Sequence, residues 1–236
     1  MIAGNTITFF CLLILFLPLG AFVINIFIGN RLPRQGDWVS IGAILITLLL
    51  SLILLISMFI NGDPNFSHEA VLPWIDLGAF KIDLGIWVDN ITVVMLVVVA
   101  LISSMTHLFS IEYMKGDIRY NRYYAYLGLF TFSMNGIVLA NNLMSLYIFW
   151  ELVGVSSYLL IGHWFEKHSA ADASKKAFLT NRVGDIGFFI GIMLMFTAIN
   201  SFNFQDLFDG VTVSYTHLRA HETREERVRR HLQEKK

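Results

Sequence analysis

Long runs of apolar residues separated by short polar segments dominate the sequence. A bilayer core of about 30 Å requires about 20 apolar residues in a helix, since every backbone polar group in lipid must be paired. Six stretches are long enough, and we expect each to form a membrane-spanning helix. They are residues 7–28, 38–60, 91–109, 123–140, 143–164 and 177–199. The pattern therefore predicts an all-α polytopic membrane protein.

The same pattern predicts how the chain is organised. Within the connection 61–90, the run from Ala70 to Asp89 mixes apolar and polar residues, which suggests short strands or an amphipathic cap. The two-residue turn Asn141-Asn142 makes the fourth and fifth helices an antiparallel hairpin. The expected parts are two amino-terminal helices (1–60), an external connection (61–90), four helices that begin a translocating unit (91–200), an external segment (201–213) and a charged tail (214–236).

Basic residues gather in alternate loops, which predicts the orientation of the chain. Loops 29–37, 110–122 and 165–176 contain most of the lysines and arginines that precede the tail, whereas the connection 61–90 has five acidic residues and a single lysine, Lys81. Lys and Arg in short loops remain on the cytoplasmic side. We therefore expect these three loops to be cytoplasmic and the amino terminus to lie outside, in a multi-pass protein of a bacterial inner membrane.

Composition narrows the function classes. The chain is 56% hydrophobic and 15% charged, with 17 basic and 18 acidic residues, so a soluble domain is excluded and no nucleic-acid partner is expected. Cys11 is the only cysteine, which excludes a thiolate metal cluster on this chain. Nucleotide, haem and iron–sulfur motifs are absent from the sequence. The lipid bilayer is the one partner that composition alone requires.

Only three ionisable Asp, Glu, Lys or Arg residues fall within the predicted spans, and they carry the functional information. An ionised side chain near the bilayer centre costs at least about 2.5 kcal/mol, so each needs a partner, water or a task. Glu151 lies close to the middle of the fifth helix, with Tyr147, Gly154 and Tyr158 on its face. This pattern suits a proton-binding carboxylate in a partly hydrated seam, or a protonated residue that joins two helices.

Arg182 and Asp185 lie three residues apart on the sixth helix and share a face. The simplest interpretation is a self-neutralising pair that faces the bundle interior. The rise per residue separates Glu151 and Asp185 by about 8 Å in height, a gap that suits one or two waters better than a direct bond. Gly184, Gly187 and Gly191 form a separate stripe on which another helix can pack closely.

The last 23 residues differ in character from the rest, with seven basic and four acidic side chains. Seven cations directly outside the sixth helix would break the charge rule that orders the other loops. We favour the interpretation that the natural chain continues into further membrane helices and that this terminus is foreign sequence. An exposed charged helix is the alternative.

Three groups of residues resemble the antiporter-like subunit L, or chain 5, of respiratory NADH:quinone oxidoreductase (complex I). The first group is WVDNI at 87–91 with HLFSIEYM at 107–114 and RYYAYL at 122–127. The second is FWELVG at 149–154 with SYLLIG at 157–162. The third is KAF at 176–178 with NRVGD at 181–185. Together they cover about residues 85–200, and the resemblance ends near Asp209.

The resemblance implies a proton-translocating subunit of an oxidoreductase that performs no redox step itself. NADH, flavin, iron–sulfur clusters and quinone would be bound by partner subunits, and this chain would hold no cofactor and no metal. Glu151 matches the family's key glutamate on the fifth helix, and Arg182 and Asp185 match a pair thought to tune the same half-channel, so all three are expected in the proton relay. The lysine that normally partners this glutamate, on a seventh helix, is missing here, which suggests an amino-terminal fragment.

Two other functions remain open at this point. The homologous subunit of a multisubunit sodium/proton antiporter shares the glutamate and needs no NADH. A passive structural subunit would use the ionic residues only to hold helices together.

Overall fold

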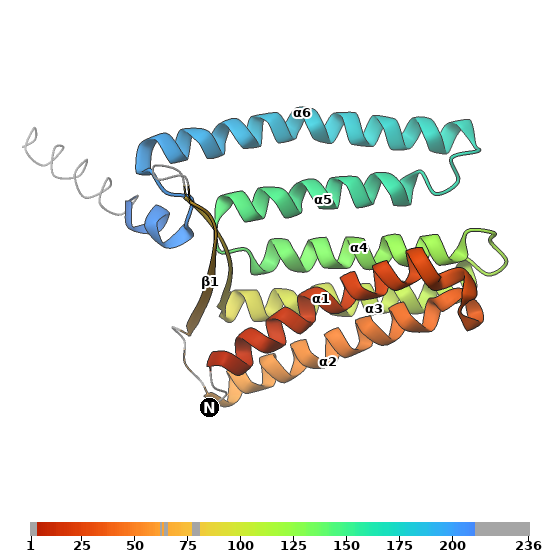
Figure 1. Ribbon diagram of the computed structural model, residues 1–236, viewed down its shortest axis with the longest axis horizontal. Helices are drawn as coiled ribbons and strands as arrows, with labels where there is room; N and C mark the ends of the chain where they lie inside the picture. Colours follow the sequence, from red (N-terminus) through yellow and green to blue (C-terminus); the bar gives the residue numbers. More distant parts are fainter. Residues whose placement is uncertain (1–3, 62, 64–65, 77–80, 211–236) are drawn as a thin grey trace, which may run out of the picture.

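The computed structural model describes residues 4–61, 63, 66–76 and 81–210. Six long helices, α1 to α6, lie side by side with a β-hairpin across one end (Figure 1), and residues 204–210 are also helical. Short 3₁₀ turns (Gly29–Arg31 and Pro33–Gly36) join the first two helices. The elements are α1 (Gly4–Ile28), α2 (Asp37–Asn61), β1 (Ser67–Asp76), β2 (Lys81–Asp89), α3 (Asn90–Tyr113), α4 (Tyr120–Leu139), α5 (Leu143–Ile161) and α6 (His168–Ile199). The predicted all-α polytopic class is confirmed.

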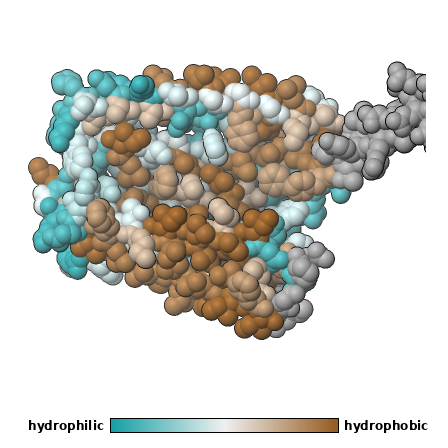
Figure 2. Space-filling view, turned by 180° about the vertical axis from the view of Figure 1, so that it is seen from behind, coloured by the Kyte–Doolittle hydropathy of each residue, from teal (hydrophilic) through white to brown (hydrophobic). Residues whose placement is uncertain are grey.

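Five of the helices are long and apolar enough to cross a membrane, namely α1, α2, α3, α5 and α6. The chain is therefore a multi-pass membrane protein. Figure 2 shows apolar side chains spread over the flanks of the bundle and polar ones gathered at the end opposite the hairpin. This arrangement suits helices whose sides face lipid and whose loops face water.

Helix α4 is the one predicted span that does not meet this apolar criterion. It lies at the centre of the bundle, packed against α1, α3 and α5. Buried Ser133 donates to the carbonyl of Leu129 at 2.7 Å, and buried Asn135 donates to the carbonyl of Ile14 at 3.1 Å. A helix surrounded by protein needs no strongly apolar surface, because neighbouring helices satisfy its polar groups. The expected helix is present, but its role is that of a core helix.

Two glycines let α4 approach its neighbours closely. A Cβ atom added to Gly128 would lie 3.0 Å from the carbonyl oxygen of Pro18 on α1. One added to Gly136 would lie 2.2 Å from the ring of Phe149 on α5. Larger residues at these positions would push the helices apart, so the glycines set the α1–α4 and α4–α5 spacing.

The predicted turn at Asn141-Asn142 joins antiparallel helices α4 and α5 and also holds the hairpin. The side-chain oxygen of Asn142 accepts a hydrogen bond from the N–H of Ser145 at 2.7 Å and so caps α5. Its amide donates to the carbonyl of Asp83 in β2 at 2.6 Å, and Asn141 donates to Glu69 in β1 at 2.9 Å. The strands expected between Ala70 and Asp89 are present and pair antiparallel from Ser67 onward.

The opposite end of the bundle, which we call the basic end, carries the connections α1–α2, α3–α4 and α5–α6 (Figure 1). The indole of Trp164 donates to Asp117 at 2.7 Å, and Arg119 pairs with Glu166, so the last two connections are tied together. Burial raises the pKa of Asp117, but hydrogen bonds from Trp164 and the Arg119 N–H and the neighbouring His163 outweigh it and hold the pKa below its ordinary value. Burial lowers the pKa of His163, although Asp117 opposes this effect.

Helix α6 begins at His168, nine residues before the predicted start at 177. The added segment contains Ala170, Ala171 and Ala173, and alanine has the highest helix propensity. Hydropathy assigned this segment to a loop because it contains two lysines and Asp172. Hydropathy detects the lipid-embedded part of a helix and misses a polar extension. The predicted tail at 214–236 lies outside the described residues.

Candidate functional site

Glu151 occupies the middle of α5, one residue before the midpoint of Leu143–Ile161. Its side chain forms an ion pair with Arg182 of α6 and is 22% exposed. Because α5 and α6 pack against each other, the arginine reaches across their interface to the carboxylate. The pair therefore lies at mid-span, where an unpaired charge would be most costly.

Arg182 also approaches Asp185 on its own helix, with 3.7 Å between Nη1 and Oδ2. Its guanidinium lies over the ring of Phe178, 4.6 Å from the centroid, an arrangement that holds the cation in place. A Cβ atom at Gly154 would lie 3.6 Å from Nη2, so this glycine leaves room for the guanidinium. One cation thus faces two carboxylates, and the three charges sum to −1.

Asp185 is buried, and the indole N–H of Trp150 donates to its Oδ1 at 2.9 Å. Trp150 precedes Glu151 on α5, so α5 contacts both charged residues of α6 through adjacent positions. The ring of Trp150 packs edge-on against Phe188, which orients the indole. Asp185 can therefore remain in the bundle with two donors on one side, the indole and the guanidinium.

We expected Arg182 and Asp185 to neutralise each other. This describes only part of the cluster, because Arg182 pairs primarily with Glu151. The expected gap between the two carboxylates is spanned by the guanidinium and the indole of Trp150. The sequence contained a signal for the pairing of Arg182 with Glu151. Arg182 is the one Lys or Arg within the six predicted spans, and these spans contain two acidic residues with which it can pair. The rise per residue gives only the difference in height between two backbone positions. It does not include the length of the arginine side chain, which spans that difference.

Tyr147 and Tyr158, expected on the face of Glu151, pack against aromatic rings of α6. The Tyr147 ring lies 5.8 Å from that of Phe188, and the Tyr158 ring lies 5.4 Å from that of Phe178. Neither hydroxyl donates to Glu151 in the part of the chain that the structure describes. Aromatic rings therefore line this side of α5, and the hydration of the seam beside Glu151 stays a prediction.

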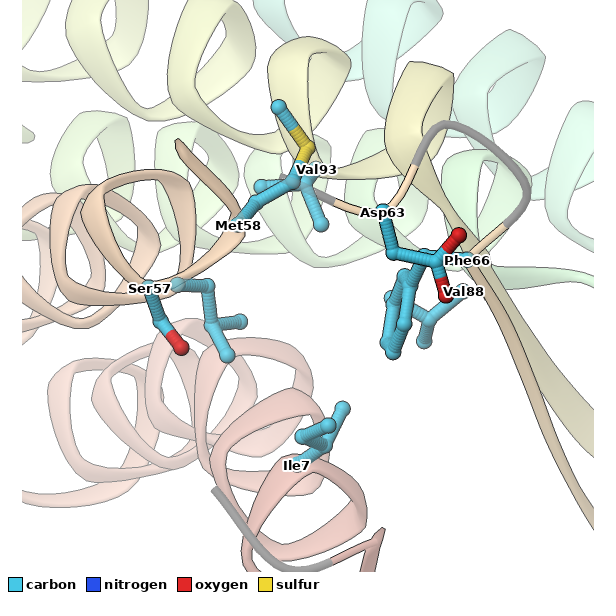
Figure 3. A pocket seen from close by; sticks show the side chains of 8 residues that line it. Ile7, Ser57, Met58, Asp63, Phe66, Val88 and Val93 are labelled. Carbon is cyan, nitrogen blue, oxygen red and sulfur yellow. The ribbon is translucent and has the colours of Figure 1, made fainter. Parts of the chain in front are cut away.

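A separate cavity of about 40 Å³ lies between α1, α2, α3 and the hairpin (Figure 3). Ile7, Met58, Phe66 and Val93 are among the mainly apolar side chains that line it. It has room for one or two waters and contains none of the charged residues of α5 and α6. Within the described ranges, no three His, Cys, Asp or Glu side chains lie close enough together to hold a metal ion.

The fold and the cluster define a multi-pass membrane protein with charged residues paired between two of its spans. Two family models match the chain. That of "NADH-Ubiquinone oxidoreductase (complex I), chain 5 N-terminus" covers residues 74–124, and that of "NADH:quinone oxidoreductase/Mrp antiporter, TM" covers residues 140–223. The chain belongs to the family of antiporter-like membrane subunits of NADH:quinone oxidoreductase. The second match extends past Asp209, where the resemblance was expected to end, so the predicted foreign tail overlaps the matched region.

Curated relatives agree with this assignment. The chain is 46% identical over 162 residues to NAD(P)H-quinone oxidoreductase subunit 5 of Chlorokybus atmophyticus chloroplasts, covering 69% of this chain and 24% of that protein. It is 39% identical over 198 residues to NADH-quinone oxidoreductase subunit L of Rickettsia typhi, covering 84% of this chain and 30% of that protein. The matched regions thus span 24% to 30% of the length of these relatives.

A solved structure shares the fold. The membrane-bound sulfane sulfur reductase, an archaeal respiratory membrane complex, contains a chain that superposes with a TM-score of 0.69 at 18% identity. The match covers 84% of this chain and 39% of that one. At this identity the likeness supports the helical arrangement alone.

Proposed function

We propose that this chain forms part of a proton-translocating subunit of NADH:quinone oxidoreductase, with Glu151, Arg182 and Asp185 in the proton relay. The observation that supports it most directly is that Arg182 contacts two carboxylates at mid-span. Arginine keeps its proton in proteins, so a carboxylate must be the group that gains and loses one. Glu151 is the better candidate, because Asp185 is additionally held by the Trp150 indole.

In this mechanism the cluster works as a switch between two pairings. While Arg182 contacts Glu151, the carboxylate is held ionised. When Arg182 turns toward Asp185, Glu151 loses its counter-charge in a medium of low dielectric and takes up a proton. Redox chemistry elsewhere in the complex would drive the change through partner membrane subunits. NADH, flavin, iron–sulfur clusters and quinone belong to those partners in this proposal, and this chain contributes charge and geometry.

The sodium/proton antiporter alternative receives less support. The description of one matching family model names Mrp antiporters beside NADH:quinone oxidoreductase, whereas the other names complex I alone. The relatives described above carry quinone oxidoreductase names. These names favour the oxidoreductase subunit.

The test replaces Glu151 with Gln in the full-length parent subunit within the assembled complex. We expect NADH oxidation to continue while the number of protons moved per NADH falls. The matched control is Glu112→Gln, which removes an exposed glutamate that pairs with Lys115 at the basic end. Full stoichiometry in the Glu151 variant would refute the relay, and intact transport with reduced assembly would favour the passive structural role.

We further propose that the basic end faces the cytoplasm of a bacterial cell and that the amino terminus lies on the other side. The grouping of the basic loops at one end of the bundle supports this orientation (Figure 1). Single cysteines introduced at exposed Lys115 and Val71 on a Cys11→Ala background, labelled with an impermeant maleimide in intact cells, test it. Labelling at position 115 but not at 71 would contradict the proposed orientation.

A further inference from the structure

A second cavity, of about 300 Å³, lies at the basic end between α4, α5 and the start of α6. It is lined by three cationic side chains, and no Asp or Glu is among its lining residues. Arg119 immediately precedes α4, Arg122 lies in its first turn, and Lys175 comes from α6. The sequence showed these cations only as members of two separate loops, and the fold brings them around one space.

The positive charge in this cavity is only partly compensated. Arg119 pairs with Glu166 and donates to the carbonyl of His163 at 3.1 Å, so its position is fixed. Lys175 lies 3.8 Å from Asp172, but both side chains are largely exposed and such a pair is weak. Among the described residues, no carboxylate lies within 4 Å of the Arg122 guanidinium. The cavity lining is therefore cationic, and Arg122 is the cation in it that has no carboxylate close by among the described residues.

A buried polar atom at this place has only a long contact with its partner. His163 lines the cavity, is 7% exposed, and its Nε2 makes no hydrogen bond. Asp117 lies 3.5 Å from it, which makes a long and weak contact. A polar ligand in the cavity would give this nitrogen the short hydrogen bond that Asp117 does not give.

We propose that this cavity binds the phosphate group of an anionic phospholipid. Guanidinium and ammonium groups are the usual ligands of phosphate, and basic pockets between membrane helices bind anionic headgroups. A lipid rather than free phosphate is favoured by position. Phe165 lines the cavity and is 58% exposed, and Ile161 and Leu179 present exposed apolar side chains beside it for acyl chains.

The test uses the assembled complex containing the full-length subunit and a photoactivatable phosphatidylglycerol, with crosslinked peptides mapped by mass spectrometry. We expect crosslinks within residues 119–126 and 158–175. The double variant Arg122→Gln, Lys175→Gln should lower crosslinking there about tenfold or more, the effect of losing one to two charge-assisted hydrogen bonds. The control Lys115→Gln, Lys176→Gln removes the same charge from positions outside the cavity lining and should leave crosslinking unchanged.

Three results would overturn the proposal. One is equal crosslinking in the double variant and its control. Another is equal crosslinking by the phosphatidylcholine analogue, which carries no net charge. The third is loss of the signal in millimolar inorganic phosphate with no preference among lipids, which would assign the cavity to free phosphate. If the double variant does not assemble, Arg122→Gln alone should weaken crosslinking and Arg122→Lys should retain it. The readout is lipid occupancy, so it is independent of proton pumping.

Discussion

Among the described residues, Arg182 is the cation that contacts Glu151 and Asp185, and replacing it with Gln removes that charge. Removal of one partner from a buried ion pair costs about 3–5 kcal/mol. The side chains of Arg182 and Glu151 are 29% and 22% exposed, so solvent screening reduces this cost. We expect the free energy of unfolding to fall by about 2 kcal/mol, or roughly thirtyfold in the equilibrium constant.

A double-mutant cycle separates the pair from its surroundings. Glu151→Gln, Arg182→Gln and the double variant are unfolded by detergent titration of the full-length subunit, with tryptophan fluorescence as the signal. If the ion pair is real, the double variant loses less stability than the two single variants together, by about 1–2 kcal/mol. Arg182→Lys should recover only part of the coupling, because an ammonium group lacks the planar shape that contacts a carboxylate and a ring at once.

The exposed pair of Lys115 and Glu112, with 3.0 Å between Nζ and Oε1, provides the matched control. Its side chains are 71% and 79% exposed, so the same cycle should give a coupling below about 0.5 kcal/mol. If the loss of unfolding free energy in the double variant equals the sum of the losses in the Glu151 and Arg182 single variants within about 0.5 kcal/mol, the two residues do not interact. That result would refute the pairing on which the proposed relay depends.

Three further predictions concern the rest of the bundle. Gly136→Ala should lower the free energy of unfolding by about 1–3 kcal/mol, because the added Cβ would lie 2.2 Å from a ring of α5. Gly20→Ala is the control and should cause no such loss, because Gly20 has open space around it. Equal shifts in the thermal unfolding of the two variants would contradict this prediction. Trp150→Phe should cost about 1.5–3 kcal/mol through the lost hydrogen bond to a carboxylate, measured in the same detergent titration. Acidification should destabilise the basic end. Because the pKa of His163 is lowered in the folded protein, protonating this ring below about pH 6.5 costs stability, and because the pKa of Asp117 is also lowered, protonating it below about pH 4 costs more. Alkaline pH should leave both groups unchanged. Hydrogen exchange at amides 114–119 measures this, and protection that is constant from pH 7.5 to 4 would contradict it.

The helices could be predicted from the sequence because lipid imposes a strict rule on long apolar segments. The start of α6 was missed by nine residues, since the polar turns near Ala170 leave the membrane and carry no hydropathy signal. The central place of α4 was equally invisible, because the side chain of Asn135 is satisfied only by the carbonyl of Ile14 on another helix. Local pattern predicts that a helix forms, and tertiary packing decides what surrounds it.

The sequence predicts which charged residues lie in the spans but not how they pair, and their role in a proton relay stays a prediction. Glu151, Arg182 and Asp185 stand out as charges in apolar helices, and the structure brings all three together. The acid that Arg182 contacts depends on how α5 and α6 face each other and on the length of the side chains. The spacing of residues along one helix gives no information about either. The role of Trp150 depends on the same facing, because a tryptophan in a span is usually assigned to packing.

Helix α6 packs mainly against α5, and its glycines at 184, 187 and 191 have open space around them. The ionic cluster therefore lies at the margin of the described helices, and the side chains of Arg182 and Glu151 are partly exposed. Hydrocarbon solvates charge poorly. In the proposed relay, a polar side chain or water adjoining this face of α6 would exchange protons with Glu151.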